Sequence, residues 1–341
     1  MKKKINIILC IVIGTLSACS EYDFDQEQYR NDISLLSNSN LIYDRQVASM
    51  EQEESIIYLI ATVSGSQPST QGFHVSLLKD DSLFNAYNKS NFDIQSEYFA
   101  KILPEKFYEF PNTEMELPQG TSKVMFPIHL KNLDELSPDS TYFLDYKLDR
   151  DKMANCNPDK SHVLLRIYKE NYYSTTKAAT YYTYTSSTIV TPSSTPNGSP
   201  EVRRPTSANR VFPIGANSVR MMAGDEDLGE YKKARHNIVT KSIIVEIGEQ
   251  LPDNPAAREV IIKPHPAADD VDADPVDVVQ LTPIGEYDNT FLLNAIRTAD
   301  GRATYYKEFR LHYKYRLKPT DVYREVNAKL RLEYNPRVEN L

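Results

Sequence analysis

The sequence YYKEFRLHYKYRL, residues 305–317, alternates apolar and polar side chains. A second alternating run, VNAKLRLEY, occupies residues 326–334, and Pro319 lies in the segment between the two. Because successive side chains of a β-strand point to opposite faces, each run places its apolar residues on one face. The two runs predict an antiparallel hairpin whose connection is longer than a tight turn, with Tyr313 and Tyr315 in the core.

Strand patterns of the same kind cover most of the chain. Short helical turns interrupt them near residues 82–89 and 96–103. The strand-like runs are residues 56–63, 73–77, 124–130, 142–148, 243–247, 260–262 and 276–281. Several of these runs are separated by turns rich in Gly, Pro and Asp. The pattern predicts an all-β protein with two antiparallel β domains.

The expected domain division follows the turns and the composition. Residues 39–155 are predicted to form an N-terminal immunoglobulin-like β-sandwich, and residues 161–341 a C-terminal β-sandwich or β-barrel. Ser, Thr and Pro crowd into residues 185–209, which we expect to be a flexible insert in the second domain.

The composition sets bounds on the function. The 341 residues suffice for two domains, and 40% hydrophobic with 25% charged residues is typical of a globular protein rather than a polytopic membrane protein. The net charge of −8 argues against nucleic acid as a partner, since phosphate binding needs a basic surface. The 23 tyrosines favour strands.

The N-terminus has the form of a secretory signal. Lys2–Lys4 precede an apolar run, Ile5–Leu16, that is too short to span a bilayer. The run ends in Leu16-Ser17-Ala18-Cys19, which resembles the bacterial lipobox. Residues 1–18 are therefore predicted to be a lipoprotein signal peptide, and Cys19 to carry the acyl chains that attach the protein to a membrane. The alternative is an ordinary signal peptide with an incidental cysteine.

An acidic tether is expected over residues 19–38. Its acids are Glu21, Asp23, Asp25 and Glu27. Such a stretch resembles the export signal of Bacteroidetes lipoproteins and implies the outer membrane, with the protein facing the cell exterior. The alternative is a solvated tether without a sorting role.

Sequence motifs for catalysis are missing, so we predict that the protein is not an enzyme and has no cofactor. The sequence contains no glycine-rich phosphate loop, no His-Glu-x-x-His and no Gly-x-Ser-x-Gly. Cys156 has no free cysteine to pair with, because Cys10 leaves with the signal peptide and Cys19 is expected to be lipidated. No His or Asn is arranged around it in the pattern of a nucleophile, which favours a passive loop thiol. A glycosidase remains open as a third hypothesis, because its two carboxylates are paired in space and not in sequence.

One acidic segment is a weak candidate for calcium. Asp270, Asp272 and Asp274 have the alternating spacing of a calcium loop. Pro275 stands where such a loop needs glycine, and Leu281 where it needs glutamate. A solvated acidic loop is the favoured interpretation.

Tyrosines are the remaining candidates for ligand binding. Aromatic rings pack against the apolar faces of sugars, and the hydroxyl of tyrosine adds a polar contact. The candidates are Tyr181, Tyr182, Tyr184, Tyr305 and Tyr306. The first three lie, with Tyr172 and Tyr173, in a Thr-rich stretch that we expect to be partly exposed. A basic outward face consists of Arg310, Lys314, Arg316, Lys329 and Arg331. It could meet an anionic glycan or an acidic partner, and the favoured alternative is a face that is only solvated.

Three segments of the first domain resemble a known module. They are Leu103–Tyr108, Pro118–Thr121 and Ser137–Tyr142. Residues from about 41 to 148 resemble the β-sandwich domain of unknown function at the N-terminus of many Bacteroidetes surface lipoproteins. That module precedes glycoside hydrolases and sugar-binding modules in polysaccharide utilisation loci.

The second domain resembles an uncharacterised family from the same lipoproteins. The resemblance rests on Asn209–Gly215, Asn217–Gly224 and Lys329–Tyr334. The two resemblances imply a surface lipoprotein that binds or presents glycan for a polysaccharide uptake system, with an outer-membrane transporter or other surface lipoproteins as partners. They bring no catalytic residues. The alternative is a structural or adhesive subunit that binds proteins through strand edges.

Overall fold

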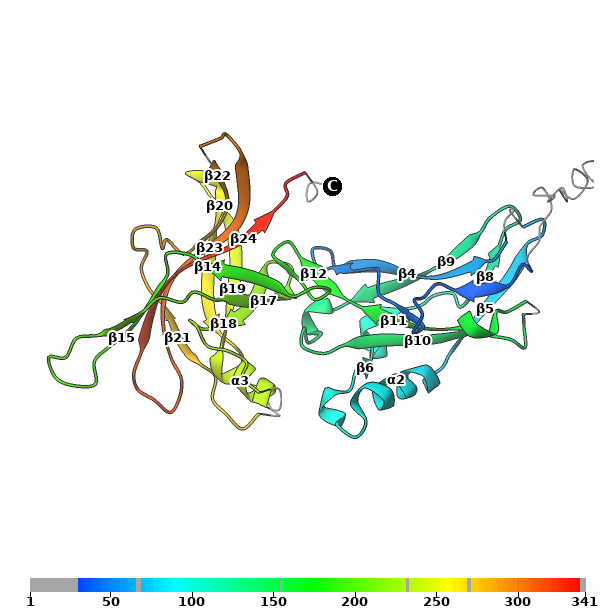
Figure 1. The fold of residues 1–341 in the computed structure, drawn as a ribbon, viewed down its shortest axis with the longest axis horizontal. Coiled ribbons are helices and arrows are strands. Elements are labelled where there is room, and N and C mark those ends of the chain that lie inside the picture. Colours follow the sequence, from blue (N-terminus) through cyan, green and yellow to red (C-terminus); the bar gives the residue numbers. More distant parts are fainter. Residues whose placement is uncertain are drawn as a thin grey trace, which may run out of the picture.

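The computed structural model describes residues 30–65, 69–153, 155–230, 233–268, 271–297 and 299–337. Cys19, the predicted signal peptide and the acidic residues 21–27 lie outside the described residues. Figure 1 shows two β domains arranged end to end. The all-β architecture with two antiparallel domains is confirmed.

The first domain is a sandwich of two sheets. One sheet has the order β1 (Ile33–Leu35), β4 (Glu54–Val63), β9 (Lys123–Lys131), β7 (Tyr108–Glu109). The other has the order β2 (Ile42–Tyr43), β11 (His162–Ile167), β10 (Tyr142–Leu148), β5 (Phe73–Lys79), β8 (Glu114–Leu117), with β6 (Lys101–Ile102) also beside β10. The alternating apolar residues of β4, β9 and β10 fill the space between the sheets.

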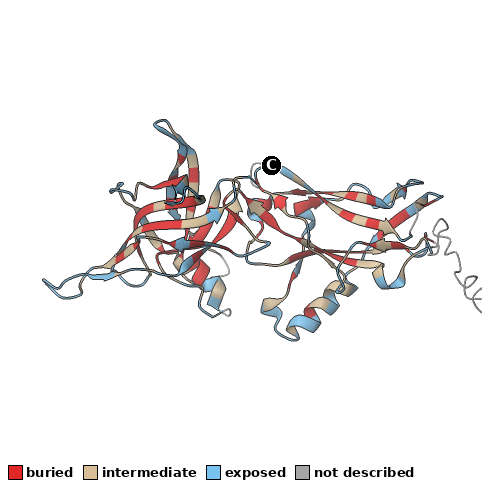
Figure 2. Ribbon diagram, turned by 45° about the horizontal axis from the view of Figure 1, so that its top comes forward, coloured by how far each residue is buried: buried red, intermediate tan, exposed pale blue. Residues whose placement is uncertain are grey.

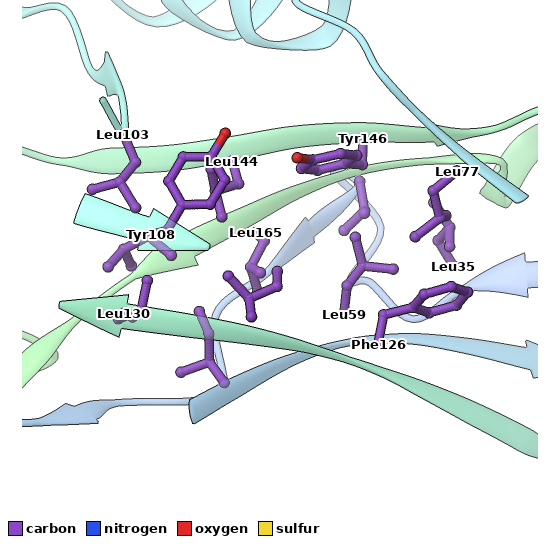
Figure 3. Packing of buried hydrophobic residues seen from close by; sticks show 14 of the residues in the cluster. Leu35, Leu59, Leu77, Leu103, Tyr108, Phe126, Leu130, Leu144, Tyr146 and Leu165 are labelled. Atoms are coloured by element: carbon purple, nitrogen blue, oxygen red, sulfur yellow. The ribbon is translucent and has the colours of Figure 1, made fainter. Parts of the chain in front are cut away.

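The core of the sandwich shows why these strands form. Leu59 on β4, Phe126 on β9, Leu144 on β10 and Leu165 on β11 all point into the space between the two sheets, and all four are buried (Figure 3). Leu165 belongs to a strand that we expected in the second domain. The sandwich therefore extends to Ile167 rather than ending at residue 155.

The expected tether is wrong at its C-terminal end. Ile33 and Leu35 are each 1% exposed, and β1 pairs antiparallel with β4 from Ile33↔Val63 to Leu35↔Ala61. A strand that buries two large apolar side chains belongs to the domain core and not to a solvated linker.

Helix α2 (Ser82–Phe92) confirms the helical turn expected near residues 82–89. It packs against the outer face of the second sheet, where Phe143 and Leu164 are buried under Leu83 and Tyr87. The alternation of β10 explains this, since Leu144 and Tyr146 point into the sandwich while Phe143 and Asp145 point toward the helix.

The second domain is a closed barrel, which resolves the alternative between sandwich and barrel. Its antiparallel strands, in order around the barrel, are β14 (Thr180–Tyr184), β17 (Ala208–Gly215), β18 (Ser218–Met222), β19 (Ser242–Leu251), β20 (Asn254–Pro264), β22 (Thr290–Arg297), β23 (Ala303–Arg316) and β24 (Arg324–Tyr334). The ring closes because β24 pairs with both β23 and β14. A short helix, α3 (Ala234–Lys241), precedes β19.

The predicted C-terminal hairpin is confirmed as β23 and β24. Phe309, Leu311, Tyr313 and Tyr315 are each at most 2% exposed and face the barrel core. In both domains the buried residues follow the strands, and the hairpin tips are exposed (Figure 2). His312 lies on the polar face of the alternation in β23, yet it is only 6% exposed, and its ring contacts the Thr282 carbonyl oxygen and Glu325.

The Ser/Thr/Pro-rich insert at residues 185–209 is more ordered than expected. It forms a hairpin of β15 (Thr188–Thr191) and β16 (Glu201–Arg203), and β15 pairs with β24. This hairpin projects from the barrel at the end remote from the first domain (Figure 1). On the other side of the sheet, β21 (Asp277–Gln280) pairs with β23.

A small sheet lies between the domains. β12 (Lys169–Asn171) pairs with β3 (Ala48–Ser49) of the first domain and with β13 (Ser174–Thr175). The chain passes directly from β11 of the sandwich through β12 and β13 to β14 of the barrel. The junction is therefore built from hydrogen-bonded strands and not from a long linker.

Candidate functional site

A hollow of about 500 Å³ opens at the domain junction. We call it the junction hollow. Its lining residues are Glu51, Tyr172, Tyr173, Ala216, Asn217, Gln250, Pro255, Ala256, Arg258, Phe291 and Leu293. Ligand sites occur preferentially at domain interfaces and combine aromatic walls with a few polar groups, and this hollow has both features.

The turn between β12 and β13 positions two of the rings. The side-chain oxygen of Asn171 accepts the backbone N–H groups of Tyr173 (3.0 Å) and Ser174 (2.9 Å), as in an Asx-turn. Its Nδ2 donates to the backbone oxygens of Gly215 (2.7 Å) and Ser218 (3.0 Å) on the barrel. Asn171 therefore fixes the turn that carries Tyr172 and Tyr173 against the barrel rim.

The rings form an edge-to-face array. Tyr172 and Tyr173 have ring centroids 5.5 Å apart at an interplanar angle of 86°, and Tyr173 lies 4.8 Å from Phe291 at 89°. Such T-shaped pairs are the favoured geometry for aromatic side chains. Tyr173 and Phe291 are buried at the base, while Tyr172 is half-buried. Tyr172 is thus the ring that a ligand in the hollow can reach most easily.

Lys307 supports Tyr172 from the barrel. Its ammonium lies 4.0 Å from the centroid of the Tyr172 ring and donates to the Tyr172 backbone oxygen at 2.5 Å. The same ammonium lies 5.7 Å from the ring of Tyr334, which packs edge-on against Tyr305 at 6.2 Å. An aromatic row therefore leads from exposed Tyr305 to the junction hollow.

Polar groups line the rest of the hollow. Asn217 lies in the β17–β18 turn and Gln250 near the end of β19, and both are exposed. Arg258 on β20 and Glu51, in the turn before β4, add one charge of each sign. Amides both donate and accept hydrogen bonds, and charged groups make the stronger ones, so these four residues suit a ligand rich in hydroxyl groups.

Burial changes the acid–base behaviour of two groups beside the hollow. Burial raises the pKa of the Tyr173 phenol, and it also raises the pKa of the half-buried Glu170 carboxyl. Tyr173 therefore stays protonated at neutral pH and keeps a hydroxyl that can donate.

A buried ion pair connects the two domains that meet at the hollow. Arg220 on β18 is 2% exposed and makes a two-pronged contact with Asp139 of the first domain, with Nη2 2.7 Å from Oδ1. Beside it, Nζ of Lys169 donates to the backbone oxygens of Leu133 (2.8 Å) and Leu136. Burial lowers the pKa of Lys169 to about 8.

The tyrosines predicted to bind a ligand differ in how far they are exposed. The stretch is partly exposed as expected, but Tyr182 and Tyr184 are 0% and 7% exposed in the barrel core and are not available to a ligand at the surface. The Tyr182 hydroxyl donates to the backbone oxygen of Tyr173 (2.9 Å), which places it behind the hollow. The strand TYYTY alternates faces, and Tyr181 is the exposed tyrosine, at 49%.

The two tyrosines of β23 lie on opposite faces. Tyr305 is 38% exposed and belongs to the aromatic row described above. Tyr306 is half-buried on the opposite face of the strand, where Arg331 lies 5.6 Å from its ring centroid. The structure therefore associates Tyr305 with the hollow and separates Tyr181 and Tyr306 from it.

The basic face is neutralised by its own neighbours. Glu308, fully buried, pairs with Arg310 (2.6 Å) and with Arg331. The remaining contacts join Lys329 to Glu286, Arg316 to Asp277 and Asp321, and Lys314 to the ring of Tyr323. The expectation of a free basic surface for an anionic glycan is wrong for this reason.

The predicted calcium ligands and Cys156 are the remaining candidates from the sequence. Asp270 lies outside the described residues, and Asp272 and Asp274 are exposed, with Asp274 3.7 Å from Lys318. Within the described part of the chain, neither belongs to a group of three side chains close enough to share an ion. Cys156 is half-buried, and burial raises the pKa of its thiol, which opposes nucleophilic character.

Sequence reasoning missed most of the hollow. Glu51, Asn217, Gln250, Arg258 and Phe291 come from separate segments that the chain brings together only after both domains fold. A second hollow, of about 530 Å³, lies between α3 and the β23–β24 connection, and no Phe, Tyr or Trp is found among its described lining residues. The ring array distinguishes the junction hollow.

Family models match both domains of the chain. An N-terminal domain model matches residues 24–155, and the corresponding C-terminal model matches residues 161–331. None of the curated proteins matches the sequence.

Solved structures from Bacteroides share the two-domain fold. A protein of unknown function from Bacteroides ovatus is 17% identical, with 89% of this chain and 94% of that chain covered at a TM-score of 0.59. Another from the same species is 15% identical, with coverages of 92% and 94% and a TM-score of 0.57. An auxiliary nutrient binding protein from Bacteroides thetaiotaomicron is 16% identical, with coverages of 82% and 83% and a TM-score of 0.55.

Proposed function

The chain belongs to the two-domain family whose N-terminal and C-terminal models match residues 24–155 and 161–331, and we propose that its junction hollow binds a glycan. The observation that carries this proposal is the combination of one accessible ring, Tyr172, with the amides of Asn217 and Gln250. A sugar presents an apolar C–H face and a rim of hydroxyls, and these groups complement each part. A relative of the same fold is named as an auxiliary nutrient binding protein, which agrees with a binding role.

Binding rather than hydrolysis is the activity that the hollow supports. Glycoside hydrolysis needs two carboxyl groups that flank the scissile bond. Among the described residues that line the hollow, Glu51 is the one carboxylic acid. Arg258 lines the same space and provides a positive charge instead of a second acid. We therefore propose a binding protein and not an enzyme.

We further propose that the protein is a lipoprotein on the cell exterior. The supporting feature is the sequence of residues 1–19, with Cys19 as the lipid-bearing residue and the outer membrane as the site of attachment. No helix in the described ranges is long and apolar enough to cross a bilayer. A surface position would let the hollow present glycan to an outer-membrane transporter or to neighbouring surface lipoproteins.

Adhesion through strand edges is the weaker candidate. β16 and β21 end the barrel sheet, and both are short. Pro200 and Pro205 flank β16, and the side chain of Gln280 on β21 already bonds to the backbone of β20 at Ile262 (2.7 Å) and Val260 (3.1 Å). Prolines and occupied hydrogen-bonding groups hinder the addition of a further strand.

A glycan array with the chain after Cys19 tests the proposal. We expect retention of one glycan class by the wild type and by Tyr181→Ala, and loss of the signal in Tyr172→Ala. Tyr181 is the matched control, because it is an exposed tyrosine on β14 that does not line the hollow. Silence of the wild type across host, plant and microbial glycans would contradict the proposal and favour a protein partner.

Lipidation is tested separately in cells. We expect labelled palmitate to enter the wild type and not Cys19→Ala, and external protease to digest the wild-type protein on intact cells. Palmitate labelling of Cys19→Ala would contradict the proposed site, and protection from protease would contradict surface exposure.

A further inference from the structure

Three polar side chains meet on the outer face of the first domain, beneath the start of α2. Asp80 follows β5, Asp145 lies on β10, and His162 begins β11. These strands are neighbours in one sheet, since β10 pairs with both β5 and β11. One possible ligand atom from each side chain lies within 4.8 Å of the others, and in the described ranges this is the one such trio of His, Cys, Asp or Glu.

One carboxylate oxygen of Asp145 lacks a hydrogen bond within the described part of the chain. Its side chain is fully buried, and its Oδ2 accepts the backbone N–H of Phe84 in the first turn of α2 (2.9 Å). Among the described residues its Oδ1 has no hydrogen-bond partner, although Nε2 of His162 lies 2.9 Å away. Nε2 is likewise buried without a hydrogen bond, because the two atoms are close but not aligned for one. Leaving such groups unsatisfied is costly, so the arrangement points to an absent shared ligand.

Asp80 completes the trio with one carboxylate oxygen. Its Oδ1 lies 3.6 Å from Nε2 of His162 and accepts the N–H of Ser82 (2.7 Å). Its other oxygen, Oδ2, pairs with the ammonium of Lys147. Each carboxylate is thus oriented by the helix start and, for Asp80, by Lys147. Two carboxylates and one ammonium leave a net charge of −1 around the imidazole of His162.

We infer that Asp80, Asp145 and His162 bind a divalent transition-metal ion of the zinc type. A metal at zinc–ligand distances separates adjacent ligand atoms by roughly 3 to 3.6 Å, and the observed separations from Nε2 are 2.9 and 3.6 Å. An imidazole nitrogen among the ligands favours zinc-like ions over calcium and magnesium, which prefer oxygen alone. Lys147 and the N–H groups of Ser82 and Phe84 act as the outer shell that holds the carboxylates in place.

The ion would tie three elements together. It would join β10 and β11 to the segment between β5 and α2, on the face of the sheet opposite the sandwich core. The site lies in the first domain and shares no residue with the junction hollow, so it stands independently of the proposed glycan binding.

Titration with Zn²⁺ after treatment with a chelator tests the inference on the chain after Cys19. We expect the thermal midpoint to rise with Zn²⁺, and Co²⁺ to give the visible absorption of an ion with mixed nitrogen and oxygen ligands. His162→Ala is expected to weaken Zn²⁺ binding by more than about 100-fold, beyond the 10–100-fold typical of losing an outer-shell partner. Asp145→Asn, which keeps the shape of the side chain, serves as a second variant if His162→Ala does not fold.

The matched control is His129→Ala. His129 lies on β9 of the same domain with Nδ1 2.9 Å from a single carboxylate, Glu54. This variant is expected to keep the full response to Zn²⁺. A wild type without a saturable response to Zn²⁺, or a His162→Ala variant with the wild-type response, would overturn the inference and leave His162 as an ion-pair partner of Asp145.

Discussion

Arg220 of the barrel and Asp139 of the sandwich form a two-pronged ion pair across the domain junction. The Arg220 guanidinium also lies 4.2 Å from the ring centroid of Phe212, and its Nε has no hydrogen-bond partner. A nearly buried guanidinium depends on its carboxylate, because without it the charge is left unpaired in the protein interior. This pair therefore fixes the relative position of the two domains and with it the walls of the junction hollow.

Asp139→Ala is expected to lower the free energy of unfolding by about 3 kcal/mol. This is the lower end of the range for breaking a buried pair, since the Asp139 side chain is 26% exposed. Urea unfolding monitored by tyrosine fluorescence measures the change. The control is Glu105→Ala, which breaks an exposed pair with Lys79 (3.0 Å) and should cost less than about 1 kcal/mol. Equal losses in both variants would show that the junction pair has no special role.

Lys169→Met is expected to change how stability depends on pH. Burial lowers the pKa of Lys169 from the ordinary 10.5 to about 8, so above pH 8 the folded state releases a proton that the unfolded state retains. The unfolded state then binds more protons, and the free energy of unfolding rises with pH in this window. The wild type should gain about 1–2 kcal/mol relative to the variant between about pH 8 and 9.5.

The comparison must stop below about pH 10. Burial raises the pKa values of Tyr184 and Tyr315, so their phenols ionise first in the unfolded state and stability falls as the pH rises further. Both tyrosines are present in the wild type and in Lys169→Met, so the difference between the two proteins isolates the lysine. A difference that stays constant from pH 7 to about 9.5 would contradict a lowered pKa for Lys169.

Gly224→Ala is expected to destabilise the barrel by about 3 kcal/mol. Gly224 has a φ of +54°, and a Cβ there would lie 2.8 Å from the hydroxyl oxygen of buried Tyr315. Its N–H donates to the Tyr313 hydroxyl (2.7 Å), and its carbonyl accepts from Tyr184, so the backbone has little freedom to move. Left-handed strain and overpacking then add.

Gly285→Ala separates the two contributions. Gly285 has nearly the same φ, +56°, but no atom within 4 Å of an added Cβ. The free energy of unfolding of Gly285→Ala should therefore fall by only about 1 kcal/mol, from the strain of the left-handed backbone alone. Thermal unfolding of the two variants provides the measurement, and a loss at Gly224 no larger than that at Gly285 would refute the packing argument.

Local alternation predicted the clearest strands but neither all of the strands nor all of their partners. The runs at residues 305–317 and 326–334 gave the hairpin and its buried face, because a strand with one buried face has a period of two. Leu165 lies on β11, whose sequence HVLLRI has three consecutive apolar residues and is not among the expected runs, and the sequence does not say that this strand completes the sandwich rather than starting the barrel. That choice depends on non-local pairing with β10.

The candidate site shows the same limit. Tyrosine content drew attention to Tyr305 and to the stretch that includes Tyr172, but composition alone does not separate exposed Tyr181 from buried Tyr182. Asn217, Gln250 and Arg258 have no local motif, and only the folded junction brings them beside the rings. The Asp80, Asp145 and His162 trio likewise arises from strand neighbours that are 65 and 17 positions apart in sequence.

Calorimetric titration with the strongest glycan from the array tests the central claim most directly. The account predicts that Tyr172→Ala weakens binding at least about tenfold, as expected for the loss of a ring at the centre of a site, while Tyr181→Ala binds like the wild type. Equal affinities of the wild type and Tyr172→Ala, with both proteins folded, would contradict the assignment of the junction hollow as the glycan site.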